Sequence, residues 1–172
     1  MPITPDTKDW TWVLEGRCGE CGFDSAATRF AQIPEIVRAN IDEWRPALTR
    51  NDVRERPDEN TWSALEYGAH VRDVFRIFLA RLQLMLNEDD PLFENWDQDQ
   101  TAIEDRYGEQ DPQTVAHELA TAGEAIAAAF ADVPAAALDR RGKRSNGSVF
   151  TVETLALYFV HDPVHHLHDV KG

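Results

Sequence analysis

Cysteine, lysine and long apolar runs are scarce in this sequence. Its two cysteines are too few for the disulfide framework that stabilises small secreted domains. No stretch approaches the ~18 consecutive apolar residues of a membrane-spanning helix, and no basic-then-apolar leader opens the chain. We therefore expect a cytoplasmic protein without a membrane partner.

Positive charge is scarce too, because 17 Lys and Arg face 31 Asp and Glu. The net charge of −14 argues against nucleic acid and anionic membranes as partners. The partner that we expect is a small-molecule substrate. With 172 residues, 42% of them hydrophobic, the chain can form one domain with a substantial core. We expect a single domain over residues 1–172, with an irregular arm at 1–24 and a helical body at 30–170. An apolar helix face left exposed on this body could form a homodimer.

Apolar residues recur at helical spacing in four segments. These segments cover about residues 33–48, 63–86, 112–131 and 151 to the tail. Each opens on a pattern typical of a helix start, namely Pro34, the Ser63–Glu66 capping box, Asp111–Pro112 and Thr151. Asn146–Gly147 is a strong turn signal and predicts a small hairpin before the last segment. Four long helices with little strand predict an all-α fold, a four-helix bundle.

Four of the six histidines lie within eight residues of the tail. His161, His165 and His168 fall at i, i+4 and i+7 and share one stripe of a helix, whereas His166 points elsewhere. A pair at i, i+4 is a usual helical chelate for a metal ion, and His165 with His168 offers a second pair. His161 and His168 are ~10 Å apart along the axis, so one ion is not expected to take all three.

A histidine pair alone binds a metal weakly, so a third ligand should come from another helix. His70 lies on the apolar stripe of the second helix, where a lone imidazole needs a partner, and His117 on the third helix is the other candidate. The alternative is a set of hydrogen-bonded histidines without any metal. Pro163 lies between His161 and His165 and should kink the last helix. The energetic cost of a proline inside a helix is tolerated more readily where the geometry of the helix matters for a site.

The segment from Trp62 to Asp73 (WSALEYGAHVRD), followed far downstream by His161-x-x-x-His165, resembles the DinB-like superfamily. That group includes the mycothiol-dependent maleylpyruvate isomerases and the bacillithiol transferases, and the similarity covers most of residues 30–170. The resemblance implies a four-helix bundle in which His70, His161 and His165 hold a divalent metal. Zinc is the expected ion, with nickel and iron as alternatives.

Three histidines with an open position describe a catalytic metal site better than a closed structural one. The resemblance implies a metal-dependent transferase or isomerase that uses a low-molecular-weight thiol as a cofactor, of the mycothiol or bacillithiol type, because a metal ion deprotonates a thiol that it binds. Water at the same position would serve hydrolysis. The alternative function is a non-catalytic metal- or ligand-binding protein of the same fold, with a role in stress responses or interactions.

Carboxylates and a tyrosine beside these histidines are weaker candidates for catalysis. Asp73 could orient a ligand or activate water, although pairing with an arginine is the alternative. Tyr158 could hydrogen-bond a substrate or belong to the core or its rim. Asp162 and Asp169 flank the tail histidines and could orient them.

The arm and a basic segment carry the remaining signals. Cys18 and Cys21 form a CxxC pair that could be half of a zinc knuckle, a redox pair or two reduced thiols that pack the arm. The resemblance implies nothing about this pair. Two tryptophans in the arm indicate that it packs onto the helical body. The basic segment 140–144 could attract an anionic ligand or be a solvated loop.

Overall fold

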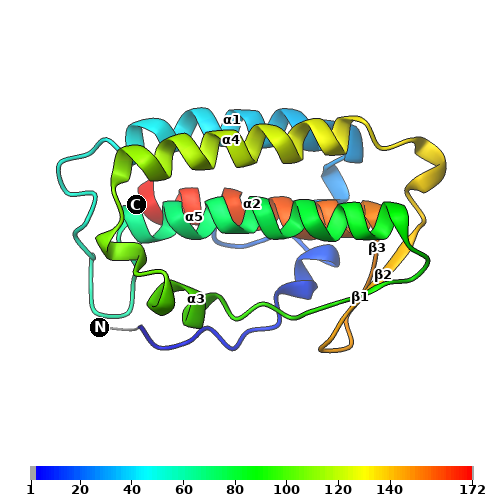
Figure 1. The fold of residues 1–172 in the computed structure, drawn as a ribbon, viewed down its shortest axis with the longest axis horizontal. Coiled ribbons are helices and arrows are strands. Elements are labelled where there is room, and N and C mark those ends of the chain that lie inside the picture. Colours follow the sequence, from blue (N-terminus) through cyan, green and yellow to red (C-terminus); the bar gives the residue numbers. More distant parts are fainter. Residues whose placement is uncertain (1–2, 172) are drawn as a thin grey trace.

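The computed structural model describes residues 3–171, which form a bundle of four long helices (Figure 1). The helices are α1 (Ile33–Ala47), α2 (Ala64–Asn87), α4 (Pro112–Ala131) and α5 (Val152–Lys171). The predicted bundle is confirmed, and each predicted helix boundary lies within one residue of the observed one. Residues 1, 2 and 172 of the expected domain lie outside the described range. None of the described helices is both long and apolar enough to cross a membrane.

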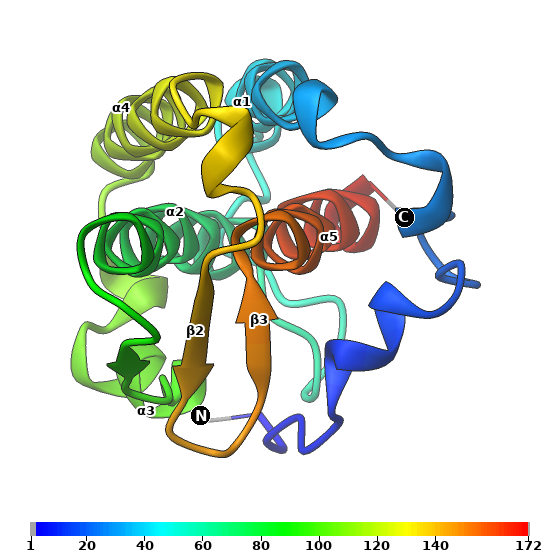
Figure 2. The same ribbon diagram turned by 90° about the vertical axis from the view of Figure 1, so that its right-hand side faces the viewer.

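Helices α1 and α2 lie at opposite corners of the bundle, as do α4 and α5. Seen along the bundle axis, α1 and α2 each pack against both α4 and α5 (Figure 2). The connection between α1 and α2 therefore crosses one end of the bundle. This arrangement places the last helix, α5, directly beside α2, although the two are far apart in the sequence.

The predicted helix-start signals are present as hydrogen bonds. The backbone N–H of Ser63 donates to Glu66 Oε2 over 2.9 Å, and the backbone N–H of Glu66 donates to Ser63 Oγ over 3.3 Å. The N–H of Thr114 donates to Asp111 Oδ2 over 2.8 Å at the start of α4. Each such cap contributes about 1 kcal/mol to helix stability. They explain why these boundaries could be located from local sequence.

A thinner layer covers one side of the α2–α5 pair (Figure 2). It contains the short helix α3 (Gln98–Glu104) and a three-stranded sheet in the order β1-β2-β3. The strands are β1 (Leu92–Phe93), β2 (Arg141–Arg144) and β3 (Val149–Thr151). The predicted hairpin is confirmed as β2–β3, with Gly147 at a φ of 99° in its turn. Strand β1 was not predicted, and it pairs in parallel with β2.

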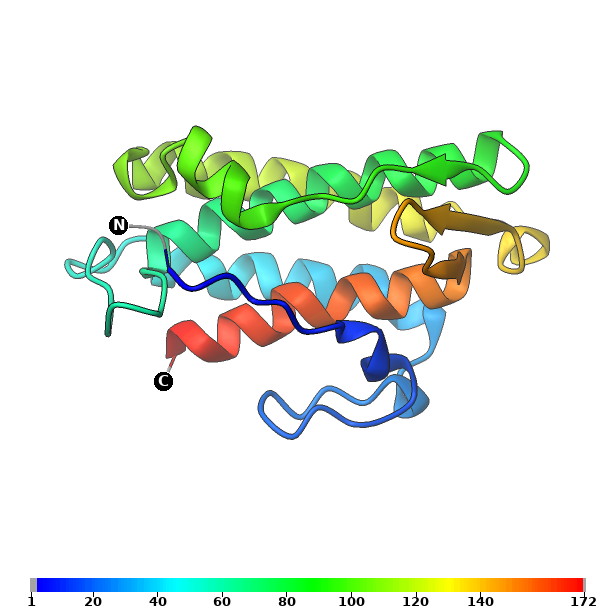
Figure 3. The same ribbon diagram turned by 90° about the horizontal axis from the view of Figure 1, so that it is seen from below.

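The N-terminal arm completes this layer. Residues 3–9 run lengthwise over the line between α2 and α5 (Figure 3). A single turn of 3-10 helix, Trp10–Leu14, then contacts α5 and buries Val13 completely. The expectation that the arm packs onto the body is confirmed.

Candidate metal centres

A cavity of about 830 Å³ lies between the α2–α5 pair and the outer layer. The arm from Ile3 to Trp10 lines it along with residues of α2, α3, the hairpin and α5. Aromatic side chains form much of its wall, among them Trp62, Trp96 and Tyr158. The arm is therefore a wall of the cavity and not a loose extension.

Two imidazoles and a carboxylate meet where α2 faces α5, and we call them the α2–α5 cluster. His70 Nε2 lies 3.3 Å from Asp162 Oδ2, and His166 Nε2 lies 3.7 Å from the same oxygen. The rings of His70 and His166 meet edge-on with 4.9 Å between their centroids. Ligand atoms of all three residues lie within 4.8 Å of one another, which suits a single metal ion.

Neighbouring groups hold the α2–α5 cluster in place. His70 is fully buried and stacks on Trp96, with 5.3 Å between ring centroids and 5° between planes. Its Nδ1 has no hydrogen-bond partner among residues 3–171. Asp169 Oδ2 lies 3.0 Å from His166 Nδ1 and orients that ring. Burial alone would raise the pKa of Asp162, but His70 and His166 lower it to about 2, so this carboxylate is ionised.

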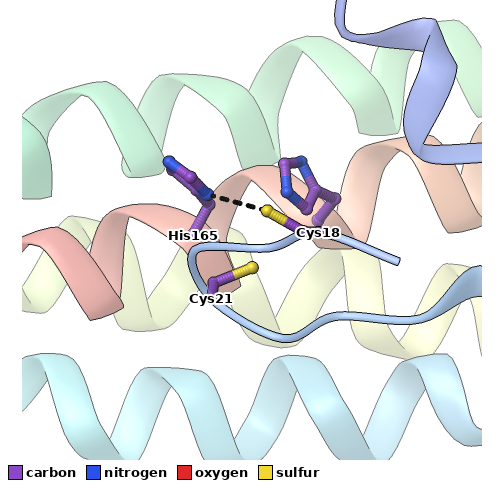
Figure 4. A group of neighbouring side chains, drawn as sticks. Cys18, Cys21 and His165 are labelled. Atoms are coloured by element: carbon purple, nitrogen blue, oxygen red, sulfur yellow. Dashed lines mark hydrogen bonds between the residues drawn. The ribbon is translucent and has the colours of Figure 1, made fainter. Parts of the chain in front are cut away.

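His161 and His165 face the arm, where they meet Cys18 and Cys21, and we call these four residues the arm–α5 cluster. The Sγ atom of Cys18 lies 3.6 Å from His165 Nδ1 (Figure 4). The two histidine rings are 5.1 Å apart, and ligand atoms of all four residues lie within 4.8 Å of one another. Burial lowers the pKa of His161 to about 4 and raises that of Cys21 to about 11. At neutral pH this imidazole and this thiol are therefore uncharged without a cation.

Two guanidinium groups line the cavity near the hairpin. Arg81 is buried and donates to the carbonyl of Glu94 over 3.0 Å, and Arg144 donates to Tyr158 Oη over 3.1 Å. Burial, together with the charge of Arg144, lowers the pKa of Arg81 to about 10. Within residues 3–171, neither arginine forms an ion pair with a carboxylate. In a chain with a net charge of −14, two such cations create a local site suited to an anionic group.

Comparison with known proteins identifies the family. The model of the DinB superfamily matches residues 35–170. The chain belongs to the DinB superfamily. Its structure is also similar to that of YfiT from Bacillus subtilis, described as a probable metal-dependent hydrolase with an unusual four-helix bundle topology. The TM-score is 0.69 at 16% identity, over 99% of this chain and 92% of YfiT. No curated protein matches the chain significantly in sequence.

This member of the DinB superfamily distributes the predicted ligands over two clusters. His70 lies in the α2–α5 cluster, whereas His161 and His165 lie in the arm–α5 cluster. A site shared by all three stays a prediction. Sequence reasoning did not select Asp162 and His166 as ligands, although they have the same i, i+4 spacing as the histidine pair. One residue along a helix is a rotation of ~100°, so the two pairs point to different neighbours.

The two predicted catalytic candidates have different surroundings. Asp73 is buried outside the cavity lining, where it pairs with Arg72 over 2.9 Å and accepts a 2.6 Å hydrogen bond from Tyr107. These contacts favour a structural role, and a catalytic one stays a prediction. Tyr158 lines the cavity beside Arg144, where its hydroxyl can contact a bound molecule.

Proposed function

We propose that the protein is a metal-dependent transferase or isomerase that uses a low-molecular-weight thiol, of the mycothiol or bacillithiol type. The α2–α5 cluster at the edge of a cavity of about 830 Å³ carries this proposal. Asp162 and His166 line the cavity, so a ligand in it can reach the cluster. The description of YfiT as a probable metal-dependent hydrolase supports the use of a metal.

The donor set of the α2–α5 cluster fits a divalent ion. Two imidazoles and one carboxylate are a usual set for catalytic zinc and also suit iron and nickel, with positions left open for other ligands. His70 Nε2 is the nitrogen that faces Asp162, at 3.3 Å from Oδ2, so it is the atom that would bind the ion. A bound ion would supply positive charge that acidifies a thiol beside it. We assign His70, Asp162 and His166 as its ligands in preference to His70, His161 and His165.

The cavity supports a reaction between two molecules. Small-molecule sites are commonly ~300–1,000 Å³ in volume, and about 830 Å³ can hold a thiol together with an electrophile. Arg81 and Arg144 would bind a carboxylate of the electrophile, and the Tyr158 hydroxyl would orient it. Aromatic side chains in the wall would pack against the bound molecules.

The test is an assay of the protein purified without added metal. We expect it to contain a divalent ion and to consume mycothiol or bacillithiol, with maleylpyruvate or 1-chloro-2,4-dinitrobenzene, at least ~10-fold faster than the uncatalysed reaction. A chelator should abolish the reaction, and zinc, nickel or ferrous iron should restore it. Metal binding and ligand-induced stabilisation without turnover would instead indicate the non-catalytic binding protein. Hydrolysis of an ester with no thiol consumed would contradict the thiol reaction.

Replacing Arg144 by glutamine tests the anion site. Because hydrogen bonds to charged groups contribute about 1.5–3 kcal/mol, KM for a carboxylate-bearing electrophile should rise ~10-fold or more. The KM for a neutral electrophile should stay the same. Arg141→Gln, at an exposed position of the same strand, is the matched control. An equal rise of KM for both electrophiles would contradict an anion site.

A further inference from the structure

We propose that Cys18, Cys21, His161 and His165 form a second metal site, a structural zinc site that fastens the N-terminal arm to α5. This site is separate from the α2–α5 cluster, and the proposed reaction does not use its residues. Its ligands come from the CxxC loop of the arm and from two successive turns of the last helix (Figure 4).

The donor set and its spacing are those of a closed zinc site. Two cysteines separated by two residues and two histidines separated by three are a standard Cys2His2 combination. Bond lengths of ~2.3 Å to sulfur and ~2.0–2.1 Å to nitrogen in a tetrahedron put the two donors ~3.6 Å apart. The separation between Cys18 Sγ and His165 Nδ1 is 3.6 Å. The side chains are thus spaced for coordination with little rearrangement.

The loop that carries the cysteines is a tight turn. The N–H of Gly22 donates to the carbonyl of Cys18 over 3.0 Å, and the N–H of Cys18 donates to the carbonyl of Phe23 over 2.8 Å. Gly22 has a φ of 79°, a conformation that favours glycine. The backbone therefore holds the two sulfur atoms near one another.

A carboxylate orients His165 for coordination. Glu20 Oε2 lies 3.1 Å from His165 Nε2, on the opposite side of the ring from Cys18. A histidine that binds a metal through one nitrogen usually donates the other N–H to a carboxylate or carbonyl, which fixes its tautomer. Glu20, between the two cysteines in the sequence, thus leaves Nδ1 of His165 free to bind an ion.

His161 supplies an unpartnered nitrogen at the same place. It is only 4% exposed, and its Nε2 has no hydrogen-bond partner among residues 3–171. Trp10 and Phe23 pack on its ring, with centroid separations of 5.5 and 5.7 Å. Trp10 also packs on His165 at 5.1 Å. Aromatic rings therefore shield the cluster, as expected for a structural ion that exchanges slowly.

The zinc site would hold one wall of the cavity, which His161 and His165 themselves line. The arm from Ile3 to Trp10 lines the cavity, and the CxxC loop that follows is the part that a metal would fix to α5. An ion there would hold this wall against α5. The role is one of positioning, and its tests rely on metal content and spectra.

The experiment is metal analysis and cobalt substitution of the reduced protein. Wild type should bind about two ions per chain, and Cys18→Ser/Cys21→Ser should bind about one. Cobalt in the wild type should give the thiolate-to-metal charge-transfer band and the intense visible bands of a tetrahedral site. His166→Ala should keep these bands, because its cysteines are intact. Glu20→Gln, which leaves all four ligands in place, should weaken zinc binding ~10- to 100-fold.

Three results would overturn the proposal. One is a cobalt spectrum of the wild type without thiolate bands. Another is a zinc content that the cysteine substitutions leave unchanged. The third is a Cys18–Cys21 disulfide in protein isolated under reducing conditions, which would make the pair a redox group. Failure of the proposed thiol reaction would leave the thiolate–cobalt bands intact, so the two proposals fail separately.

Discussion

Replacing His166 by alanine is expected to lower kcat/KM of the thiol reaction by more than ~100-fold. His166 would be one of three ligands in the α2–α5 cluster, and His70 with Asp162 alone should hold a divalent ion weakly. The loss should therefore appear both in turnover and in metal content after gel filtration. Initial rates and elemental analysis of the same preparations provide the measurement.

His168→Ala is the matched control for this experiment. His168 lies two residues further along α5, and its side chain is exposed, so its removal should leave metal content and rate unchanged. A His166→Ala protein that keeps its second ion and its activity would contradict our choice of ligands. It would then favour the set implied by the sequence resemblance, in which His161 and His165 join His70.

Removing zinc from the arm–α5 cluster is expected to lower Tm by about 8–16 °C. An ion present at ~1,000 times its Kd stabilises the folded state by about 4 kcal/mol. In a domain of this size, 1 kcal/mol shifts Tm by about 2–4 °C. The measurement is calorimetry of His166→Ala with and without a chelator, because that variant should carry only the structural ion.

The control adds Cys18→Ser and Cys21→Ser to His166→Ala. This triple variant should melt at the lower temperature, and the chelator should no longer shift its Tm. An equal chelator effect with and without the cysteines would show that the stabilising ion lies elsewhere. Hydrogen exchange should locate the effect, because loss of the ion should expose amides of the arm before those of the bundle.

The helices could be predicted because their signals are local. Ser63 with Glu66, and Asp111 with Pro112, mark helix starts within a few residues of sequence. Strand β1 has no such signal, because Leu92 and Phe93 pair with a strand about fifty residues away. Its pairing depends on how the outer layer packs against the bundle. A local sequence pattern contains no information about this packing.

The candidate site could be predicted only in part, for a similar reason. The sequence was enough to identify α2 and α5 as helices that carry metal ligands. Which histidines of α5 join the α2–α5 cluster, and which join the arm–α5 cluster, depends on the face of α5 that meets α2. His161 and His166 are separated by five positions and point to different partners. Cys18 and His165 are 147 positions apart in the sequence, and they meet because of the path that the arm takes over the bundle. That path is set by tertiary packing, for which the CxxC motif alone gives no evidence.

The diagonal placement of α1 and α2 has a consequence for how the chain acquires its structure. Helix α1 packs mainly on α4 and α5 and not on α2, so long-range contacts must form before the core is complete, and folding should be slow for a helical protein. His70 and Asp162, 92 positions apart, meet only after α5 has joined the bundle. During synthesis, Cys18 and Cys21 therefore stay without their histidine partners until the last helix is made. The proposed zinc site thus requires both thiols to stay reduced until α5 has been synthesised.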